Sequence, residues 1–322
     1  MLVRKMLANT RMWWNFRRCV TQSLRGADVS SPHDKDVVVL PCWQRPEFLW
    51  HCLTNLTQAE GVGTVHILFR PDTGSLPENI EVIRSFQHQL PTFEILPPTP
   101  CPFRRTKPSA NLLLGCLYAA RISRKFVFLV EEDIMVARDF FRWHRAVHAT
   151  AARLFCSIAV KNPNRSVAVS DDTGEFYLSG GDYCSNGVCF DKDILGTIVA
   201  AHVNMAYLRS PKKYLRRQFP CSLIGLAYVE QDGLVRRIQE ISPLPIAWPC
   251  VPRAFHSGFY GSNRPGALGG PLQNRIRTLT DTIYDAEAMR RLAGRPEFIE
   301  TSLPCSLHVP AWSALRRVDI PS

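Results

Sequence analysis

The sequence predicts an α/β fold with a mainly parallel sheet flanked by helices and a smaller β region in the second half. Two observations indicate this. Short runs of apolar, often β-branched residues occur at 37–41, 64–69 and 125–133, as is typical of strands buried on both faces of a parallel sheet. Stretches with helical character separate these runs, as crossover helices do. Ligands of such sheets gather at the carboxyl ends of the strands.

The elements of the first half have local causes. Asp36 opens the run VVVLP (37–41), and Pro46 then stands at a favourable first-turn position for a helix over 48–59. Ser109 can cap a helix over 110–123, and KFVFLVEED (125–133) is the strongest buried strand of the chain. The other expected elements are a strand at 64–69, a helix near 78–89 and a strand at 93–97.

After an expected helix over 138–155, the pattern changes to short strands separated by Gly and Asn/Asp turns. We expect strands at 166–171, 175–179, 187–191 and 245–251, and helices at 193–207, 229–240 and 281–293. The 322 residues can bury a sizeable core. We expect a basic N-terminal extension (1–35), a main domain (36–262, with halves 36–137 and 138–262) and a C-terminal tail (263–322).

Positive charge is concentrated in two places. The formal net charge is +11, which favours polyanionic partners such as nucleotide diphosphates, nucleic acid or anionic membrane. The N-terminal arm carries six Lys/Arg in 28 residues, and Trp13 and Trp14 lie among them, so this arm could pack on the body, on DNA or on a membrane surface. The segment Arg209–Arg217 carries five Lys/Arg and no acid. It suits either a solvated face or a track for a phosphate backbone.

The sequence also indicates a cellular compartment. It has neither an apolar stretch long enough for a membrane span nor the apolar segment of a secretory signal. The eleven cysteines are odd in number and form no CxxC pair, which indicates reduced thiols. We expect a cytoplasmic protein of a bacterium or a phage-infected host, with no indication of its oligomeric state.

Three consecutive acids, Glu131, Glu132 and Asp133, end the strand at 125–133. Like charges at this spacing repel one another unless a cation neutralises them. A hard divalent ion with oxygen ligands, Mg²⁺ or Mn²⁺, would do so and would bridge to a substrate diphosphate. The alternative is a solvated acidic turn, but the apolar segment FVFLV directly before the triplet argues against an exposed position.

The order of these parts resembles GT-A fold glycosyltransferases, which are Rossmann-like. The segment VVVLPCWQRPEFLWHCLTNL is similar to their opening strand, turn and helix, and the segment from Ser109 to His144 is similar to their DXD-type region. The acidic triplet followed by Asp-Phe-Phe is similar to the Golgi alpha-mannoside beta-1,2-N-acetylglucosaminyltransferase family. Family 2-like transferases share these features in part. The resemblance covers roughly residues 36–262.

This resemblance implies roles on the donor side. Asp133 would be the direct metal ligand, Glu132 would face the ribose or the metal, and Glu131 would face the donor sugar. The family usually has Asp where this chain has Glu132, so that contact is less well defined. The nucleoside pocket would be lined by Pro41 through Arg45 and by Asp72, although Asp72 also suits a plain turn.

The resemblance also implies a general base and a closing loop. Segment 228–237 resembles the catalytic-base region, so Asp232 or Glu230 would accept the acceptor proton, and we favour Asp232. The region around Ser185 resembles the acceptor-side loop. Segment 253–264 resembles the loop that closes over the diphosphate. There His256 would be a second metal ligand or a diphosphate contact, and Arg253 and Arg264 would clamp phosphate.

Together these features predict a metal-dependent, inverting glycosyltransferase that uses a nucleoside-diphosphate sugar, by family default a UDP-sugar, and a hydroxyl acceptor. Two acceptors stay open: a hydroxymethylated base in DNA, as in phage DNA-modifying enzymes and served by 209–217 and the N-terminal arm, or an envelope or capsule precursor. Two other functions are alternatives. A sugar nucleotidyltransferase usually has a Gly-rich loop where this chain reads PCWQRPEF, and a non-catalytic nucleic-acid-binding protein could retain the same fold.

Overall fold

The computed structural model describes residues 10, 12–21, 34–103, 106–151, 153–160, 176–181, 183–226, 228–250 and 252–256. Residues 12–21 are helical. The expected strand at 166–171, the expected helix at 281–293 and the tail 263–322 lie outside the described residues. Among the described helices, none combines the length and the apolar character that crossing a bilayer requires.

An eight-stranded sheet forms the centre, in the order β3-β2-β1-β4-β8-β6-β9-β7. Its first half contains β1 (Asp36–Cys42), β2 (Val65–Pro71), β3 (Phe93–Ile95) and β4 (Phe126–Leu129), which pair in parallel. Every residue of β2 and β4 is buried, as expected for strands covered on both faces. The α/β prediction with a largely parallel sheet is confirmed.

The strands of the second half extend the same sheet in mixed orientation. They are β6 (Cys156–Ile158), β7 (Phe176–Ser179), β8 (Val188–Asp191) and β9 (Ile246–Pro249). β8 runs antiparallel to β4 and β6, whereas β6 and β9 are parallel. A separate two-stranded antiparallel sheet joins β5 (Ile134–Val136) to β10 (Ala254–His256).

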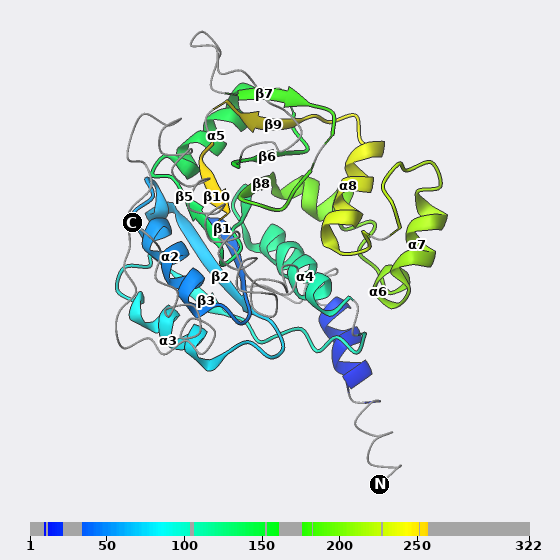
Figure 1. Cartoon of the computed structure of the whole chain (residues 1–322), viewed down its shortest axis with the longest axis horizontal. Coiled ribbons are helices and arrows are strands. Elements are labelled where there is room, and N and C mark those ends of the chain that lie inside the picture. The colour runs from blue at the N-terminus through cyan, green and yellow to red at the C-terminus, as the bar shows by residue number, and fades with distance from the viewer. Residues whose placement is uncertain are drawn as a thin grey trace, which may run out of the picture.

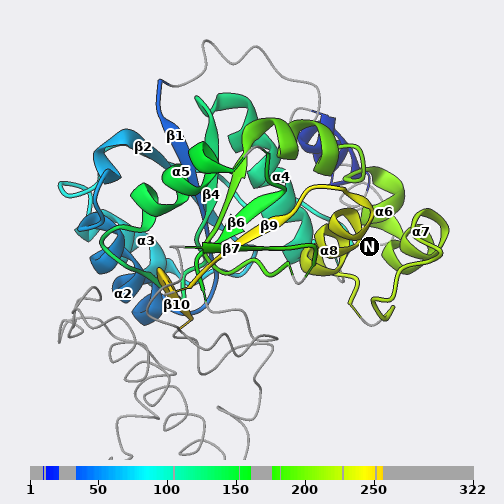
Figure 2. The ribbon, with the colours of Figure 1, turned by 90° about the horizontal axis from the view of Figure 1, so that it is seen from above.

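Helices surround this sheet (Figures 1 and 2). α2 and α3 lie on one side of the molecule, and α6, α7 and α8 lie on the opposite side (Figure 1). Pro46 and Pro77 occupy the first turns of α2 and α3, where a missing N–H leaves no bond unmade. The helices are α2 (Pro46–Thr57), α3 (Pro77–Ser85), α4 (Lys107–Ile122), α5 (Phe140–Thr150), α6 (Met205–Arg209), α7 (Pro211–Gln218) and α8 (Gln231–Ile241), with a 3₁₀ turn at Val62–Thr64.

The single helix expected at 193–207 is wrong. A π-helix spans Ile194–Val199, and a separate helix, α6, begins at Met205. Asn204 explains the second start, because its side chain accepts hydrogen bonds from the backbone N–H groups of Ala206 and Tyr207 at 3.0 and 3.1 Å. Such a cap competes with continuation of the preceding helix.

The sheet is closed at its N-terminal edge by a buried ion pair. Asp36, 1% exposed, accepts hydrogen bonds from the Phe126 backbone and from the Arg145 guanidinium at 3.1 and 2.9 Å. These bonds join the start of β1 to β4 and α5. The opposite, carboxyl edge of the same strands holds the acidic triplet.

Candidate functional site

The carboxyl ends of β1, β2 and β4 bring together residues that are far apart in the sequence. The parallel register pairs Cys42 with Pro71, and the Asp72 N–H donates to the Cys42 carbonyl at 2.9 Å. The acidic triplet follows β4 at this same edge. Burial first, then the charges of Glu132 and Asp72, raise the pKa of the Cys42 thiol. Asp72 and the triplet therefore border one region of the sheet.

Arg45 contacts two of the three acids directly. Its Nε donates to Glu132 Oε1 at 2.9 Å, and Nη1 lies 2.5 Å from Asp133 Oδ2. Glu132 and Asp133 are 4% and 3% exposed. The expectation that a divalent ion lets these acids coexist is therefore incomplete, because a guanidinium from the first strand–helix turn already pairs with two of them. Arg45, which we expected to line the nucleoside pocket, pairs with two acids of the triplet.

The strand β10 brings His256 to Asp133. Antiparallel pairing sets His256 opposite Ile134, and His256 Nε2 lies 3.3 Å from Asp133 Oδ2. Burial alone would raise the pKa of Asp133, but the hydrogen bond from His256 and the charge of Arg45 outweigh it and lower that pKa to about 2. Asp133 is therefore held as a carboxylate.

Glu131 has different neighbours. The Ser185 hydroxyl donates to Glu131 Oε1 at 2.7 Å, and Ser185 also lies near Asp232 and lowers the pKa of that carboxyl against the larger effect of burial. Burial first, then the charges of Asp133 and Asp232, raise the pKa of Glu131 to about 8. Burial likewise raises the pKa of Asp232. Glu131 and Asp232 are thus both neighbours of Ser185, whose hydroxyl proton is donated to Glu131.

Asp232 lies in the first turn of α8, and this turn is fixed by neighbouring helices. The Gln231 N–H donates to Ser109 Oγ at 3.1 Å, which docks α8 on the start of α4. A Cβ on Gly233 would lie 2.1 Å from the Tyr228 carbonyl oxygen, so only glycine permits this close approach. The segment before α8 therefore folds back tightly and sets the position of Asp232.

The residues of the donor side can be tested for their fit to a divalent ion. Within the described part of the chain, no three His, Cys, Asp or Glu side chains converge at a metal-binding arrangement. Asp133 and His256 are nevertheless adjacent, and Mg²⁺ is commonly held by one or two protein ligands with the rest supplied by water and substrate phosphates. Asp133 and His256 would be the protein ligands of such an ion, which would supply positive charge beside the triplet.

The remaining expected site residues differ in position. Pro41 is half-buried in β1 opposite Arg70. Asp72 is half-buried and accepts a hydrogen bond from the Thr73 N–H at 2.7 Å. Glu230 is exposed, and it accepts from the Val229 N–H at 3.1 Å.

The two expected phosphate clamps also differ. Arg253 Nε is paired with Asp139 Oδ2 at 3.1 Å, so a phosphate contact would have to use its other guanidinium nitrogens. Arg264 lies outside the described residues.

Sequence reasoning missed two contacts that organise the site. Arg45 and Glu132 are separated by 87 positions, and Ser185 and Glu131 by 54. Neither pair carries a local signal, because each contact depends on which strands are neighbours in the sheet. An acidic triplet at a buried strand end signals that partners must exist, but it does not identify them.

No protein-family model matches the chain, and no curated protein matches it. Among solved structures, it is similar to S. aureus TarS 1–349 at 12% identity over 80% of this chain and 83% of that chain, with a TM-score of 0.40. It is similar to the mannosyltransferase PcManGT from Pyrobaculum calidifontis in complex with GDP-Man and Mn²⁺ (12% identity, 98% and 89% covered, TM-score 0.40). A third likeness is to the galactosyltransferase LgtC in complex with donor and acceptor sugar analogs (10% identity, 84% and 98% covered, TM-score 0.42).

Proposed function

We propose that this protein is a glycosyltransferase that moves a sugar from a nucleoside-diphosphate sugar, by default a UDP-sugar, to a hydroxyl acceptor. One observation carries the proposal: a charge-paired group (Asp133, His256, Arg45) and a carboxyl pair (Glu131, Asp232) lie side by side at the carboxyl edge of a parallel sheet. Such an edge is where open α/β sheets bind ligands. The first group suits a departing diphosphate, and the second suits an attacking hydroxyl.

The donor side stabilises the leaving group. Asp133 and His256 would hold Mn²⁺ or Mg²⁺, which when bound supplies positive charge to the diphosphate oxygens. Arg45 adds a fixed cation 2.9 Å from Glu132, and we assign Glu132 to a contact with the ribose or the metal. Pro41 and Asp72 border the position of the nucleoside. Arg253 and Arg264 are assigned to the loop that closes over the phosphates.

The acceptor side removes a proton. Asp232 takes the proton of the acceptor hydroxyl, the hydroxyl oxygen bonds to the anomeric carbon, and the bond from that carbon to the diphosphate breaks, which inverts the anomeric centre. Among the described residues Asp232 Oδ1 is buried and has no hydrogen-bond partner, as a base awaiting a substrate hydroxyl would. Glu230 is the alternative base, but its side chain is exposed to solvent.

The acceptor class follows from charge. A net charge of +11 suits a polyanionic acceptor, either DNA carrying a hydroxymethylated base or an anionic envelope or capsule precursor. Transfer of radiolabelled sugar to hydroxymethylated duplex DNA, set against transfer to envelope lipid precursors, distinguishes the two.

The donor is tested by thermal unfolding with a panel of nucleotides and nucleotide sugars, with and without Mn²⁺. A ligand that binds only the native state raises its stability by mass action, so one nucleotide sugar should raise the unfolding temperature, and more so with Mn²⁺. Asp133→Asn should remove the Mn²⁺-dependent part. The exposed Glu81 on α3 provides a matched control, since Glu81→Gln should leave the shift unchanged. No response to any nucleotide sugar would refute the proposal.

A further inference from the structure

The helix α7 presents a row of cations to solvent. Its inner positions, Tyr214 and Leu215 among them, are buried against the body. Four of its five exposed positions are basic, namely Lys212, Lys213, Arg216 and Arg217, and the fifth is Gln218. None of these four forms an ion pair with a residue that the structure describes. The helix therefore carries an uncompensated positive face whose orientation is set by a buried apolar face.

An almost fully exposed apolar side chain follows this helix in the sequence. Leu223, in the segment after α7, is 96% exposed. Both of its flanks are anchored: Ser222 Oγ donates to Glu240 Oε2 at 2.5 Å, and Arg237 Nη2 donates to the Ile224 carbonyl at 2.7 Å. Leu223 is therefore held outward by its neighbours. Exposing a large apolar side chain to water in this way is unfavourable in free energy unless a partner covers it.

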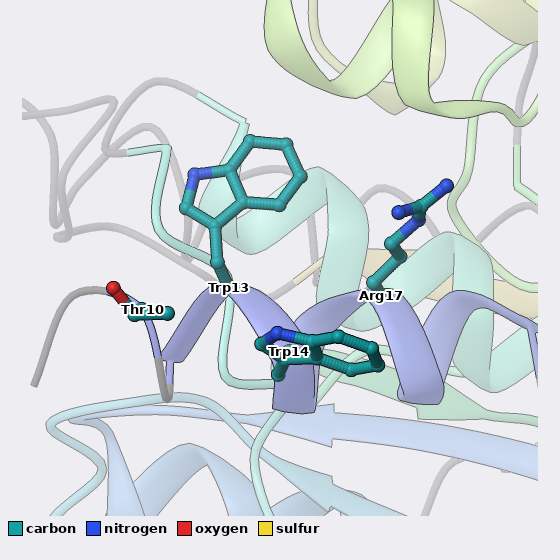
Figure 3. A pocket seen from close by; sticks show the side chains of 4 residues that line it. All are labelled: Thr10, Trp13, Trp14 and Arg17. Carbon is teal, nitrogen blue, oxygen red and sulfur yellow. The ribbon is translucent and has the colours of Figure 1, made fainter. Parts of the chain in front are cut away.

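The N-terminal helix adds aromatic side chains and more cations (Figure 3). Phe16 and Val20 are buried against the body, whereas Trp14 is 70% exposed. Arg17 and Arg18 follow it by three and four positions and are exposed. Residues at this spacing share a helix face. A tryptophan beside arginines is typical of a helix that lies at a membrane–water interface.

The two helices belong to one end of the molecule (Figures 1 and 2). The ring of Trp13 packs edge-on against Phe103, with centroids 5.7 Å apart. A few residues later, Thr106 Oγ1 donates to the Leu208 carbonyl of α6 at 2.7 Å, and α7 follows α6 after a single residue. Phe103 and Thr106 thus contact the N-terminal helix and α6, respectively.

From this combination we propose that α7, Leu223 and the N-terminal helix form a docking surface for an anionic phospholipid bilayer. The cations match the charge of the lipid headgroups. Leu223 decides between this partner and a nucleic acid, because an aliphatic side chain has no favourable contact on a phosphate backbone but enters the acyl boundary of a bilayer. The surface would hold the protein at the membrane without a spanning helix. It does not depend on the proposed glycosyl transfer.

The test is flotation of the full-length protein with phosphatidylcholine vesicles that contain or lack phosphatidylserine. We expect association only with the phosphatidylserine vesicles, weakening as salt is raised. Each Lys or Arg near an anionic bilayer strengthens binding roughly fivefold, so Lys212→Ala/Lys213→Ala should weaken association roughly 25-fold. Leu223→Ser should weaken it several-fold with no change in charge.

Two controls make the outcome specific. Arg84→Ala/Arg124→Ala removes the same charge from exposed positions outside the surface and should leave association nearly intact. Unfolding temperatures should match the parent, since all substituted side chains are exposed. Equal loss in the control variant, or no association with phosphatidylserine vesicles, would overturn the proposal. Tight binding to duplex DNA that is insensitive to Leu223→Ser, with no vesicle binding, would assign the surface to nucleic acid instead.

Discussion

The two ends of the acidic triplet experience opposite environments although they are two residues apart. Asp133 faces Arg45 and His256, and its pKa is lowered to about 2 against the effect of burial. Glu131 faces Ser185 and the charge of Asp232, and its pKa is raised to about 8, first by burial. Asp133 is the more buried of the two, at 3% exposure against a half-buried Glu131, so burial does not explain why its pKa is the lower one.

The difference teaches that counter-charge, not the triplet itself, sets the chemistry of each acid. A buried carboxyl with a cation beside it stays ionised, and one that meets only a hydroxyl and other acids is driven toward its neutral form. The same edge of the sheet can therefore hold a fixed anion for binding and a carboxyl pair for proton transfer. The four predictions below test this contrast in order of decreasing effect.

Removing the carboxylate of the acceptor side should have the largest effect. Asp232→Asn leaves the shape of the site but cannot accept a proton, so we expect kcat for sugar transfer to fall about 10³-fold, or about 4 kcal/mol. The donor-induced thermal shift should persist, because the donor side is unchanged. Glu230→Gln is the matched control, and a larger loss in that variant than in Asp232→Asn would transfer the role of base to Glu230.

Removing the counter-charge of the donor side should come next. Arg45→Met leaves Glu132 and Asp133 buried without their guanidinium, so the free energy of unfolding should fall by about 3 kcal/mol in urea denaturation. The exposed Arg142–Glu60 pair provides a control, since Arg142→Met should cost less than about 1 kcal/mol. Adding Glu132→Gln to Arg45→Met should restore part of the loss, and no restoration would show that packing, not charge, was lost.

A pair of buried histidines on α5 gives a second test of how burial and neighbouring groups set a pKa. His144 and His148 share the Ser157 hydroxyl at 2.6 and 3.0 Å, whereas Glu131 and Asp232 are both neighbours of Ser185. Burial lowers the pKa of His148 to about 4 and that of His144 well below its usual value. Above about pH 6.5 both histidines are neutral in the folded and the unfolded state, and the free energy of unfolding is at its full value. As the pH falls toward 4, the unfolded state takes up protons that the folded state disfavours, and the free energy of unfolding decreases.

The measurement is the free energy of unfolding between pH 7 and about pH 4.5. Each histidine adds a slope of at most about 1.4 kcal/mol per pH unit, so His148→Gln should flatten the curve by about 2 kcal/mol at its acid end. A parallel curve for the variant would mean that His148 titrates alike in the folded and unfolded states.

The smallest effect should come from the Ser185 hydroxyl. Ser185→Ala removes the 2.7 Å hydrogen bond to Glu131, and we expect a loss of about 1 kcal/mol in unfolding free energy. Ser222→Ala, which removes an exposed hydrogen bond to Glu240, is a control that should change stability less. Equal losses of unfolding free energy in both variants would mean that the buried Ser185 hydroxyl stabilises the fold no more than an exposed one.

Some of this protein could be predicted from the sequence because the signals are local. The apolar runs before residue 134 predict β1, β2 and β4, and Pro46 predicts the start of α2, since strand and helix preferences act over a few residues. Local signals failed at 193–207, where the cap at Asn204 starts a new helix within an otherwise helical pattern. The roles of the site residues remain predictions that the substitutions above will test.

By itself, the sequence determined an α/β chain with three adjoining acids at the end of a buried strand. Only the tertiary structure decided what each acid meets: Arg45 from the β1–α2 turn, His256 through the register of β10 against β5, and Ser185 from the segment before β8. Those contacts join residues 54 to more than 100 positions apart, and they exist only once strand order and register are set. Local preferences cannot specify them, because the energy of a buried charge depends on the groups that folding places around it.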